Sequence, residues 1–541
     1  MNDAGAGRAA PPVVPPRAGG PEDSLPARGE GRGGGGRGGG SLAEAALVVL
    51  AAAFVILTRW ACFPRYLADW DSVEFAEALS RFDVTRNCPH PPGFPLFILA
   101  GRLLFACVRD EARALSLVSC LASTASVPLL WALARRWLDR GGALVLLAWW
   151  VTQPLFWYYG ALHLSYPLEV VVVLTLLLLW TGGVPASLGG LAYGLAGGVR
   201  PSTWLVLGLV ALRWARGLTW RERGLAAAAA ALGAALWLAP TAWLSGGWHD
   251  YRVASSVVNR GFFVSQSLLG GNLRGSLEHL RHLGEYLWSG HGPWLGLIGI
   301  GLALAWNERR AHAERWRVNA LWLLGGVLYC VCFHMGQPGY LLAFAPPLGV
   351  GLAVCVRRMA PQPESARRIL PLVALMIGLC QSVVFLGGNG PFSAAAIARA
   401  DRGWDDLGTL VRREGRPEDT LVMSFGSFRQ AAWFLPAYRH VIATLLFRHP
   451  ADFPLAVHNV HVSQHRRLTP ERWLYPSGFQ LAPWPLPPGT RRLLVVEPAL
   501  TWIYHGRQPL REVTAGGARA WVLDVPPGAR LVYDFGRWEV R

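Results

Sequence analysis

Three carboxylates lie close together early in the sequence, in Asp69-Trp70-Asp71-Ser72-Val73-Glu74, shortly after a long apolar run. Charged groups beside a bilayer are costly unless they meet water, a metal ion or a substrate. Asp71 and Glu74 are spaced one helical turn apart. Such a pair suits a general base that deprotonates a hydroxyl, or a divalent-cation site, for Mg²⁺ or Mn²⁺, that orients a phosphate. An acidic first turn of a helix at the membrane surface explains the same pattern without chemistry.

The segment His90-Pro91-Pro92-Gly93-Phe94-Pro95 follows in the same polar stretch. Each proline fixes φ and restricts the residue before it, so the pattern predicts a rigid, extended turn. A plain connector before the next apolar run explains the prolines alone. His90 is predicted to face a substrate, together with Asp69.

The composition indicates a polytopic membrane protein. Of 541 residues, 52% are hydrophobic and 16% are charged, the mean hydropathy is +0.29, and long apolar runs recur through the first 388 residues. Such a chain is too apolar and too long for one soluble core. The net charge of +17 comes from Arg alone, without Lys, and its clustering between apolar runs indicates topology signals and excludes nucleic acid as a partner. The Arg-, Ala- and Gly-rich composition favours a bacterial source.

The distribution of arginine predicts a topology. Residues 1–42, rich in Arg, Gly and Pro, are expected to be a disordered cytoplasmic tail. With this tail inside, the Arg-rich loops between later spans also fall inside. Residues 43–388 then form a transmembrane domain of about eleven helices, while 96–108 lies at the interface or re-enters. The expected spans lie near 45–63, 114–134, 142–160, 166–181, 186–198, 202–214, 225–244, 291–306, 318–334, 340–356 and 369–387.

Four loops and turns, together with the C-terminal residues, are predicted to lie outside a bacterial plasma membrane. They are a first loop at 64–95, the turn Trp157–Glu169, a long loop at 245–290, the turn His334–Tyr340 and the C-terminal residues 389–541. In the last of these, strand-like runs such as LVMSFG and AWVLDV predict a small α/β or β-rich domain. The sequence does not indicate the role of this domain.

Two further turns are candidates for substrate binding. Arg200 lies between two short apolar runs, where a buried cation is expensive, so we expect it to pair with an anion such as a lipid phosphate. Gln337 and Tyr340 lie in a turn rich in Gly and Pro between two spans. An arginine in an ordinary loop and a plain Gly-Pro hairpin are the alternatives.

Taken together, an acidic element in the first external loop followed by HPPG and an apolar helix resembles the bacterial lipid-linked-sugar glycosyltransferases of the C superfamily (GT-C). The branch similar to protein O-mannosyltransferases fits best. The resemblance covers about residues 43–215 and implies a catalytic role for Asp71, with Glu74 at the second acidic position.

The next external turn departs from the family pattern, which usually reads W-x-x-x-A-x-x-x-E-x-Y. Trp157 and Ala161 fit, and Tyr166 fits with one residue fewer after Ala161 than the pattern has, which puts Leu164 at the glutamate position. Glu169 is a candidate substitute, and the resemblance implies that Tyr166 and Glu169 bind substrate. Because the glutamate of the pattern is missing here, the sequence does not decide whether two acidic residues share the mechanism or whether a metal cofactor takes part. The turn that contains Gln337 and Tyr340 resembles a substrate-facing turn of the same superfamily, which implies that these two residues also face the substrate.

These features imply an inverting membrane glycosyltransferase. It would move a hexose or pentose from a polyprenyl-phosphate donor to a glycan, lipid or protein acceptor outside the membrane. Asp71 would deprotonate the acceptor, and Arg200 or an external arginine would hold the lipid phosphate. Two alternatives remain: a non-catalytic transporter or flippase of lipid-linked glycans, and an inactive member of the family.

Overall fold

A computed structural model describes residues 37–67, 69–264, 266–307, 313–442, 473–474, 484–534 and 537–541. Residues 48–541 form one compact unit, separate from residues 1–47. The predicted cytoplasmic tail, residues 1–42, lies almost entirely outside the described residues.

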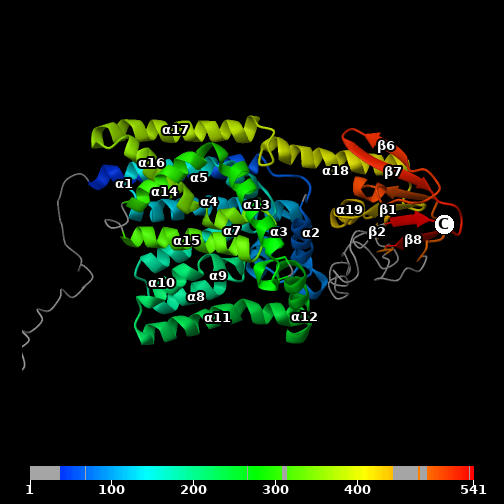
Figure 1. The fold of residues 1–541 in the computed structure, drawn as a ribbon, viewed down its shortest axis with the longest axis horizontal. Coiled ribbons are helices and arrows are strands. Elements are labelled where there is room, and N and C mark those ends of the chain that lie inside the picture. The colour runs from blue at the N-terminus through cyan, green and yellow to red at the C-terminus, as the bar shows by residue number, and fades with distance from the viewer. Residues whose placement is uncertain are drawn as a thin grey trace, which may run out of the picture. The chain divides into compact units, whose positions relative to one another are not determined.

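Helices dominate the chain up to residue 414 (Figure 1). They are α1 (Arg37–Trp60), α2 (Trp70–Ser80), α3 (Pro95–Val108), α4 (Glu111–Trp137), α5 (Arg140–Thr152), α6 (Pro154–Ala161), α7 (Tyr166–Thr181), α8 (Ala186–Ala196), α9 (Ser202–Val206), α10 (Gly208–Arg216), α11 (Trp220–Leu244), α12 (Trp248–Val258), α13 (Leu273–His291), α14 (Leu295–Asn307), α15 (Ala313–Cys332), the 3₁₀ helix η5 (Pro338–Phe344), α16 (Pro346–Met359), α17 (Pro363–Gly387) and α18 (Ala394–Glu414).

Four helical segments are long and apolar enough to cross a membrane, namely Leu42–Trp60, Glu111–Trp137, Trp220–Leu244 and Pro363–Gly387. Two bent pairs, α6 with α7 and η5 with α16, raise this number to six if each pair is one span. Other apolar helices are shorter. The helix α5, for example, extends about 20 Å, less than the roughly 30 Å of a bilayer core. The described residues thus contain several candidate spans, and about eleven crossings stay a prediction.

Some segments differ from their expected form. A continuous helix over 142–160 is wrong, because α5 ends at Thr152 and Pro154, which has no N–H to donate, begins α6. The segment 202–214 is likewise divided, into α9 and α10. The loop predicted at 245–290 is largely helical and contains α12 and most of α13, and the loop at 64–95 contains α2.

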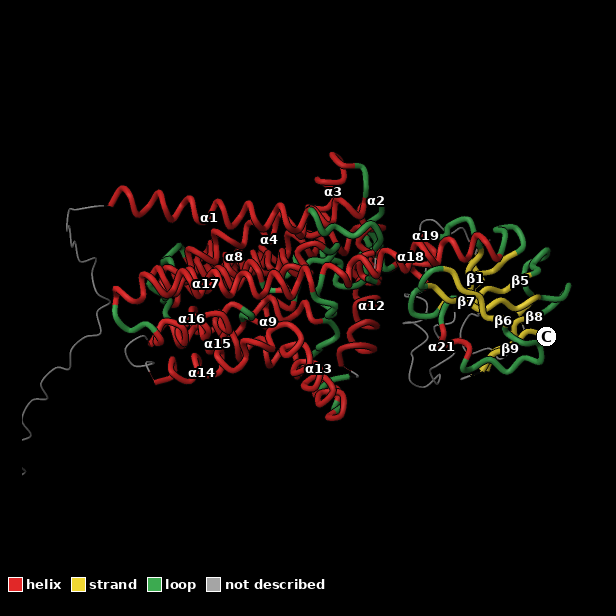
Figure 2. The backbone as a smooth tube through the Cα atoms, turned by 90° about the horizontal axis from the view of Figure 1, so that it is seen from above, coloured by secondary structure: helices red, strands yellow, loops and turns green. Residues whose placement is uncertain are grey.

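The C-terminal residues form two sheets, as the strand-like runs predicted (Figure 2). The larger sheet has the order β3-β2-β1-β5-β7-β6, in which β1, β2, β3 and β5 are parallel and β6 and β7 pair antiparallel. The smaller, antiparallel sheet has the order β4-β8-β9. The strands are β1 (Thr420–Ser424), β2 (Arg439–Ile442), β3 (Trp473–Leu474), β4 (Trp484–Pro485), β5 (Arg492–Val495), β6 (Arg511–Ala515), β7 (Ala518–Asp524), β8 (Arg530–Asp534) and β9 (Arg537–Val540), and two short helices are α19 (Phe428–Phe434) and α21 (Pro498–Thr501).

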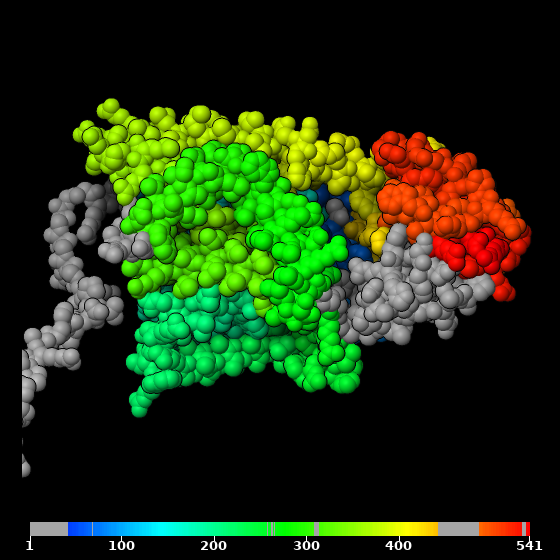
Figure 3. All heavy atoms as spheres, in the orientation of Figure 1, coloured from blue at the N-terminus to red at the C-terminus, as the bar shows by residue number. Residues whose placement is uncertain are grey.

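Successive side chains of a strand point to opposite faces of a sheet, and in the larger sheet both faces carry apolar side chains. On one face, Val422 of β1 packs in a cluster with Leu410 and Val411 of α18. On the other face, Leu421 and its neighbours pack in a cluster with Trp538 of β9. The helix α18 follows α17 and leads into these strands (Figure 1), and its residues appear in yellow between the green helical part and the orange C-terminal residues of the space-filling view (Figure 3). This order places α19, which follows β1, in contact with α2 of the helical part.

Small residues allow α8 and α11 to approach closely. A Cβ atom added to Gly190 would lie 2.1 Å from the carbonyl oxygen of Ala226, and one added to Gly194 would lie 2.1 Å from that of Ala230. Glycine at such positions lets two helix backbones touch where no other residue fits.

We therefore expect Gly190→Val to push α8 away from α11. Overpacking of this kind costs about 1–3 kcal/mol, so the thermal unfolding midpoint in detergent should fall and the yield of monodisperse protein should drop. The matched control is Gly224→Val on α11, where an added Cβ meets nothing within 4 Å. Equal midpoints for the two variants would contradict the close approach.

Candidate active site

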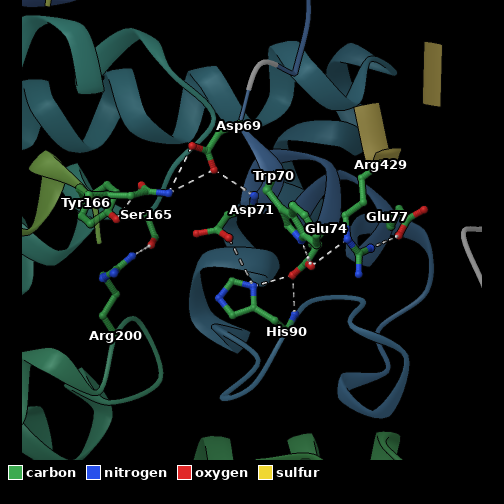
Figure 4. A network of polar contacts seen from close by, with 11 residues as sticks. Asp69, Trp70, Asp71, Glu74, Glu77, His90, Ser165, Tyr166, Arg200 and Arg429 are labelled. Carbon is green, nitrogen blue, oxygen red and sulfur yellow. Dashed lines mark hydrogen bonds and ion pairs between the residues drawn. The ribbon is translucent and has the colours of Figure 1, made fainter. Parts of the chain in front are cut away.

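The acidic motif forms the start of α2, as its spacing predicted. Asp69 is the N-cap, and its Oδ1 accepts a hydrogen bond from the backbone N–H of Asp71 at 2.9 Å. Asp71 lies in the first turn and Glu74 one turn later (Figure 4). The Asp71 side chain is 26% exposed, whereas that of Glu74 is 1% exposed. Of these two carboxylates, Asp71 is therefore the one that solvent and a substrate reach.

The turn after α2 brings His90 back onto this helix. Its backbone N–H donates to Glu74 Oε2 at 3.0 Å, and its ring Nδ1 lies 2.5 Å from the same oxygen. Nδ1 also lies 3.8 Å from Asp71 Oδ1. Gly93 supports this path with a φ of +105°, a conformation in which a side chain is strained. The imidazole thus stands between the two carboxylates.

Burial and neighbouring charges set the protonation of this cluster. Burial raises the pKa of Asp71 above its ordinary range, although the nearby His90 acts in the opposite direction. For His90, burial alone would lower the pKa, but the charges of Asp71 and Glu74 outweigh it and the pKa is raised. Burial and the charge of Asp71 raise the pKa of Asp69 to about 7. His90 consequently keeps its proton to a higher pH than a free imidazole.

Glu74 is held by partners on both carboxylate oxygens. Trp70 Nε1 donates to Oε1 at 2.7 Å, and Arg429 Nε lies 3.1 Å from the same oxygen, while Oε2 faces His90. Arg429 belongs to α19, which lies among the C-terminal strands, and no motif in the sequence marks it. Proximity in space alone identifies it.

A second charged cluster surrounds Arg200. Its Nε lies 3.1 Å from Glu169 Oε2, and its Nη1 donates to Ser165 Oγ at 2.8 Å. Glu169 Oε1 also accepts hydrogen bonds from Ser202 Oγ at 2.6 Å and Thr203 Oγ1 at 3.1 Å. The anionic partner expected for Arg200 is thus supplied within the chain by Glu169, and a contact with lipid phosphate stays a prediction.

Gln337 joins the two clusters. The Tyr166 hydroxyl donates to its Oε1 at 2.8 Å, and its Nε2 donates to Asp69 Oδ2 at 3.2 Å. The Arg200 guanidinium carbon lies 4.1 Å from the ring centroid of Tyr166 and 4.8 Å from that of Tyr340, within cation–π range. One network therefore contains every site residue named from the sequence: Asp69, Asp71, Glu74, His90, Tyr166, Glu169, Arg200, Gln337 and Tyr340.

The turn Trp157–Glu169, where the chain departs from the family pattern, has no exposed acidic side chain. Leu164, at the family's glutamate position, is 2% exposed. Glu169 is 1% exposed and paired with Arg200. Neither residue offers a carboxylate that a substrate reaches without rearrangement.

The fit of a metal ion is poor. Asp71, Glu74 and His90 bring potential ligand atoms within 4.8 Å of one another. Mg²⁺ prefers oxygen ligands, but His90 offers nitrogen, and its Nδ1 already contacts Glu74. The guanidinium of Arg429 against Glu74 adds a positive charge beside any cation. With Glu74 and His90 engaged, these residues do not fit a catalytic Mg²⁺ or Mn²⁺ site.

Comparisons with known proteins agree with the motifs. The family model described as the N-terminal domain of the protein O-mannosyl-transferase TMEM260 matches residues 71–149. No curated protein sequence matches this chain.

Solved structures show a wider likeness of fold. ArnT from Cupriavidus metallidurans bound to undecaprenyl phosphate has a TM-score of 0.56 at 14% identity, over 88% of this chain and 98% of that chain. Its apo state gives a TM-score of 0.56 at 14% identity, over 89% and 98%. The Archaeoglobus fulgidus oligosaccharyltransferase, in complex with Zn and sulfate, has a TM-score of 0.49 at 12% identity over 83% and 67%. This chain therefore has a GT-C fold and resembles, over residues 71–149, the protein O-mannosyltransferases.

Proposed function

We propose that this protein is a membrane glycosyltransferase that moves a sugar from a polyprenyl-phosphate donor to an extracytoplasmic acceptor. The observation that carries the proposal is Asp71, a partly exposed carboxylate among buried charges, at the position that the family resemblance assigns to catalysis. The fold shared with ArnT, whose structure contains undecaprenyl phosphate, supports a lipid-linked donor.

The chemistry needs a base, a stabilised leaving group and an oriented acceptor. The acceptor hydroxyl oxygen attacks the anomeric carbon while the bond from that carbon to the phosphate oxygen breaks. The polyprenyl phosphate leaves with the electron pair, and Asp71 takes the hydroxyl proton. Attack opposite the leaving group inverts the anomeric configuration. His90 and Arg200, one cation from each cluster, offset the negative charge that develops on the phosphate.

The proposal includes a location and a topology. About eleven crossings in a bacterial plasma membrane, with the N-terminus inside, place α2 and the C-terminal domain on the outer side. The sugar is a hexose or a pentose, and the acceptor is a glycan, a lipid or a protein. The candidate spans and the clustering of arginine between them support this arrangement.

Replacing the proposed base gives the first test of function. In lipid-reconstituted protein offered a panel of polyprenyl-phosphate sugars, Asp71→Asn should lower the release of polyprenyl phosphate by about 10²–10⁴-fold, the usual size of general-base catalysis. Folding and donor binding should persist, because the amide replaces a partly exposed side chain. The control is Glu278→Gln on α13, whose side chain is 48% exposed. Near-full activity of Asp71→Asn would remove Asp71 from the mechanism, and movement of the sugar lipid across the bilayer without phosphate release would favour a flippase.

The pH profile of turnover gives a second test. A base must be deprotonated, so the rate should fall as the pH drops through the pKa of Asp71. Because burial raises this pKa above the ordinary aspartate value of 3.8, the acid limb of kcat should lie above about pH 4. Rates measured from pH 4 to 9, with return to pH 7.5 to detect irreversible unfolding, check this expectation. A profile that stays flat down to pH 4 would contradict it.

The poor fit of a metal ion predicts transfer without one. Polyprenyl phosphate release should change less than about twofold when EDTA is added or when Mg²⁺ or Mn²⁺ is supplied, because Arg429 and His90 already neutralise Glu74. A loss of activity in EDTA that Mn²⁺ or Mg²⁺ restores would show that the cluster rearranges to bind a cation.

A further inference from the structure

We propose that the C-terminal domain completes the active site through Arg429, a positioning residue that holds Glu74 and thereby keeps His90 beside Asp71. This inference rests on the proposed function. It adds to that function a residue outside the motifs and a role for the C-terminal domain.

Arg429 is buried against the acidic face of α2. Its side chain is 4% exposed, its Nε lies 3.1 Å from Glu74 Oε1, and its Nη1 lies 3.9 Å from Glu77 Oε2. Both carboxylates are 1% exposed. The guanidinium carbon also lies 5.3 Å from the ring centroid of Trp70. Charges buried this deeply need partners, and here each domain supplies charge that the other neutralises.

Glu74 connects Arg429 with His90. Its Oε1 faces Arg429, while its Oε2 accepts the backbone N–H of His90 and contacts the ring Nδ1. Without the guanidinium, a fully buried carboxylate either takes up a proton or turns toward water. Both changes weaken the hold on His90, which lies 3.8 Å from Asp71. The effect of Arg429 therefore reaches Asp71 through two intervening side chains.

The C-terminal sheet fixes the position of α19, which carries Arg429. Glu497, two residues after β5, accepts hydrogen bonds from the backbone N–H groups of Phe425, Gly426 and Ser427 at 2.9, 2.9 and 2.8 Å. These residues form the connection between β1 and α19. The start of α19 is thus tied to a neighbouring strand, and Arg429 projects from a supported helix.

The domain also docks through contacts that do not involve Arg429. The Tyr66 hydroxyl donates to Asp405 Oδ1 at 2.6 Å, and the Tyr66 ring packs edge-on against Phe434 with centroids 4.7 Å apart. The backbone N–H of Arg65 donates to Asp401 at 3.0 Å. These contacts should keep the domain in place when Arg429 alone is changed, so positioning and docking can be tested separately.

The experiment compares Arg429→Gln, Arg429→Lys and the control Arg511→Gln in reconstituted full-length protein. Arg511 lies in the same domain and its side chain is 59% exposed. Arg429→Gln should lower kcat for polyprenyl phosphate release at least about tenfold, because small misplacements of catalytic groups cost up to about 10²-fold, while KM for the donor stays within about twofold. Arg429→Lys, which keeps the charge, should recover part of kcat, and Arg511→Gln should match the wild type. Wild-type kcat in Arg429→Gln would overturn the inference.

Two further variants separate positioning from docking. Asp405→Asn weakens the contact with Tyr66 but leaves Arg429 in place, so its kcat should stay close to that of the wild type. Glu74→Gln combined with Arg429→Gln should lose little more kcat than the more damaging single variant, because both act through one contact. Additive losses would show that Arg429 does not act through Glu74, and an equal loss in Asp405→Asn would show that Arg429 acts only by holding the domains together; either result would overturn the inference.

Release of polyprenyl phosphate by the wild type tests the proposed function separately from the role of Arg429. If the wild type releases no polyprenyl phosphate from any donor, the glycosyltransferase proposal fails, whatever the variants do. The same double-mutant cycle is then read from thermal unfolding midpoints. Non-additive midpoint shifts for Glu74→Gln and Arg429→Gln would support the contact between the domains, and additive shifts would overturn it.

Discussion

The structure around α2 depends on one constraint, which is that the buried carboxylate of Glu74 must be neutralised. A carboxylate with 1% of its surface exposed is stable only with donors and cations around it. The chain supplies an indole, an imidazole and a guanidinium from three separate segments. Meeting this requirement holds the HPPG turn against α2 and places α19, with Arg429, at the same carboxylate. Of Asp71 and Glu74, Asp71 remains the accessible carboxylate, because Glu74 engages these partners.

The Arg200 cluster also neutralises a buried charge, but with other groups. There the cation is buried, and Glu169 neutralises it with help from hydroxyl donors. The GT-C pattern places a glutamate earlier, where this chain has the buried Leu164. The acidic side chain near this turn is Glu169, and it contacts Arg200 within the chain. Gln337, a neutral group with both a donor and an acceptor, connects the two clusters without adding charge.

Local sequence was enough to predict the parts of the site that local rules control. Helical spacing placed Asp71 and Glu74 in α2, prolines predicted the turn that carries His90, and the cost of a buried cation identified Arg200 as a residue that needs an anion. Arg429 could not be found in this way, because it stands in a short helix whose partner carboxylate lies in a distant part of the sequence. The breaks between α5 and α6 and between α9 and α10 were also missed, since hydropathy measures apolar content and does not register where a helix bends.

The contact between Glu74 and Arg429 also has a consequence for biosynthesis. The ribosome makes Glu74 early and Arg429 only after all the candidate spans. During synthesis the early helices therefore carry a carboxylate that already has His90 beside it but still lacks the guanidinium of Arg429, and the site is complete only when the C-terminal strands have folded. Chains that end before Arg429, through a nonsense mutation or proteolysis, lack this cation as well as the strands that follow it. Completion of the whole polypeptide thus becomes a condition for an ordered site.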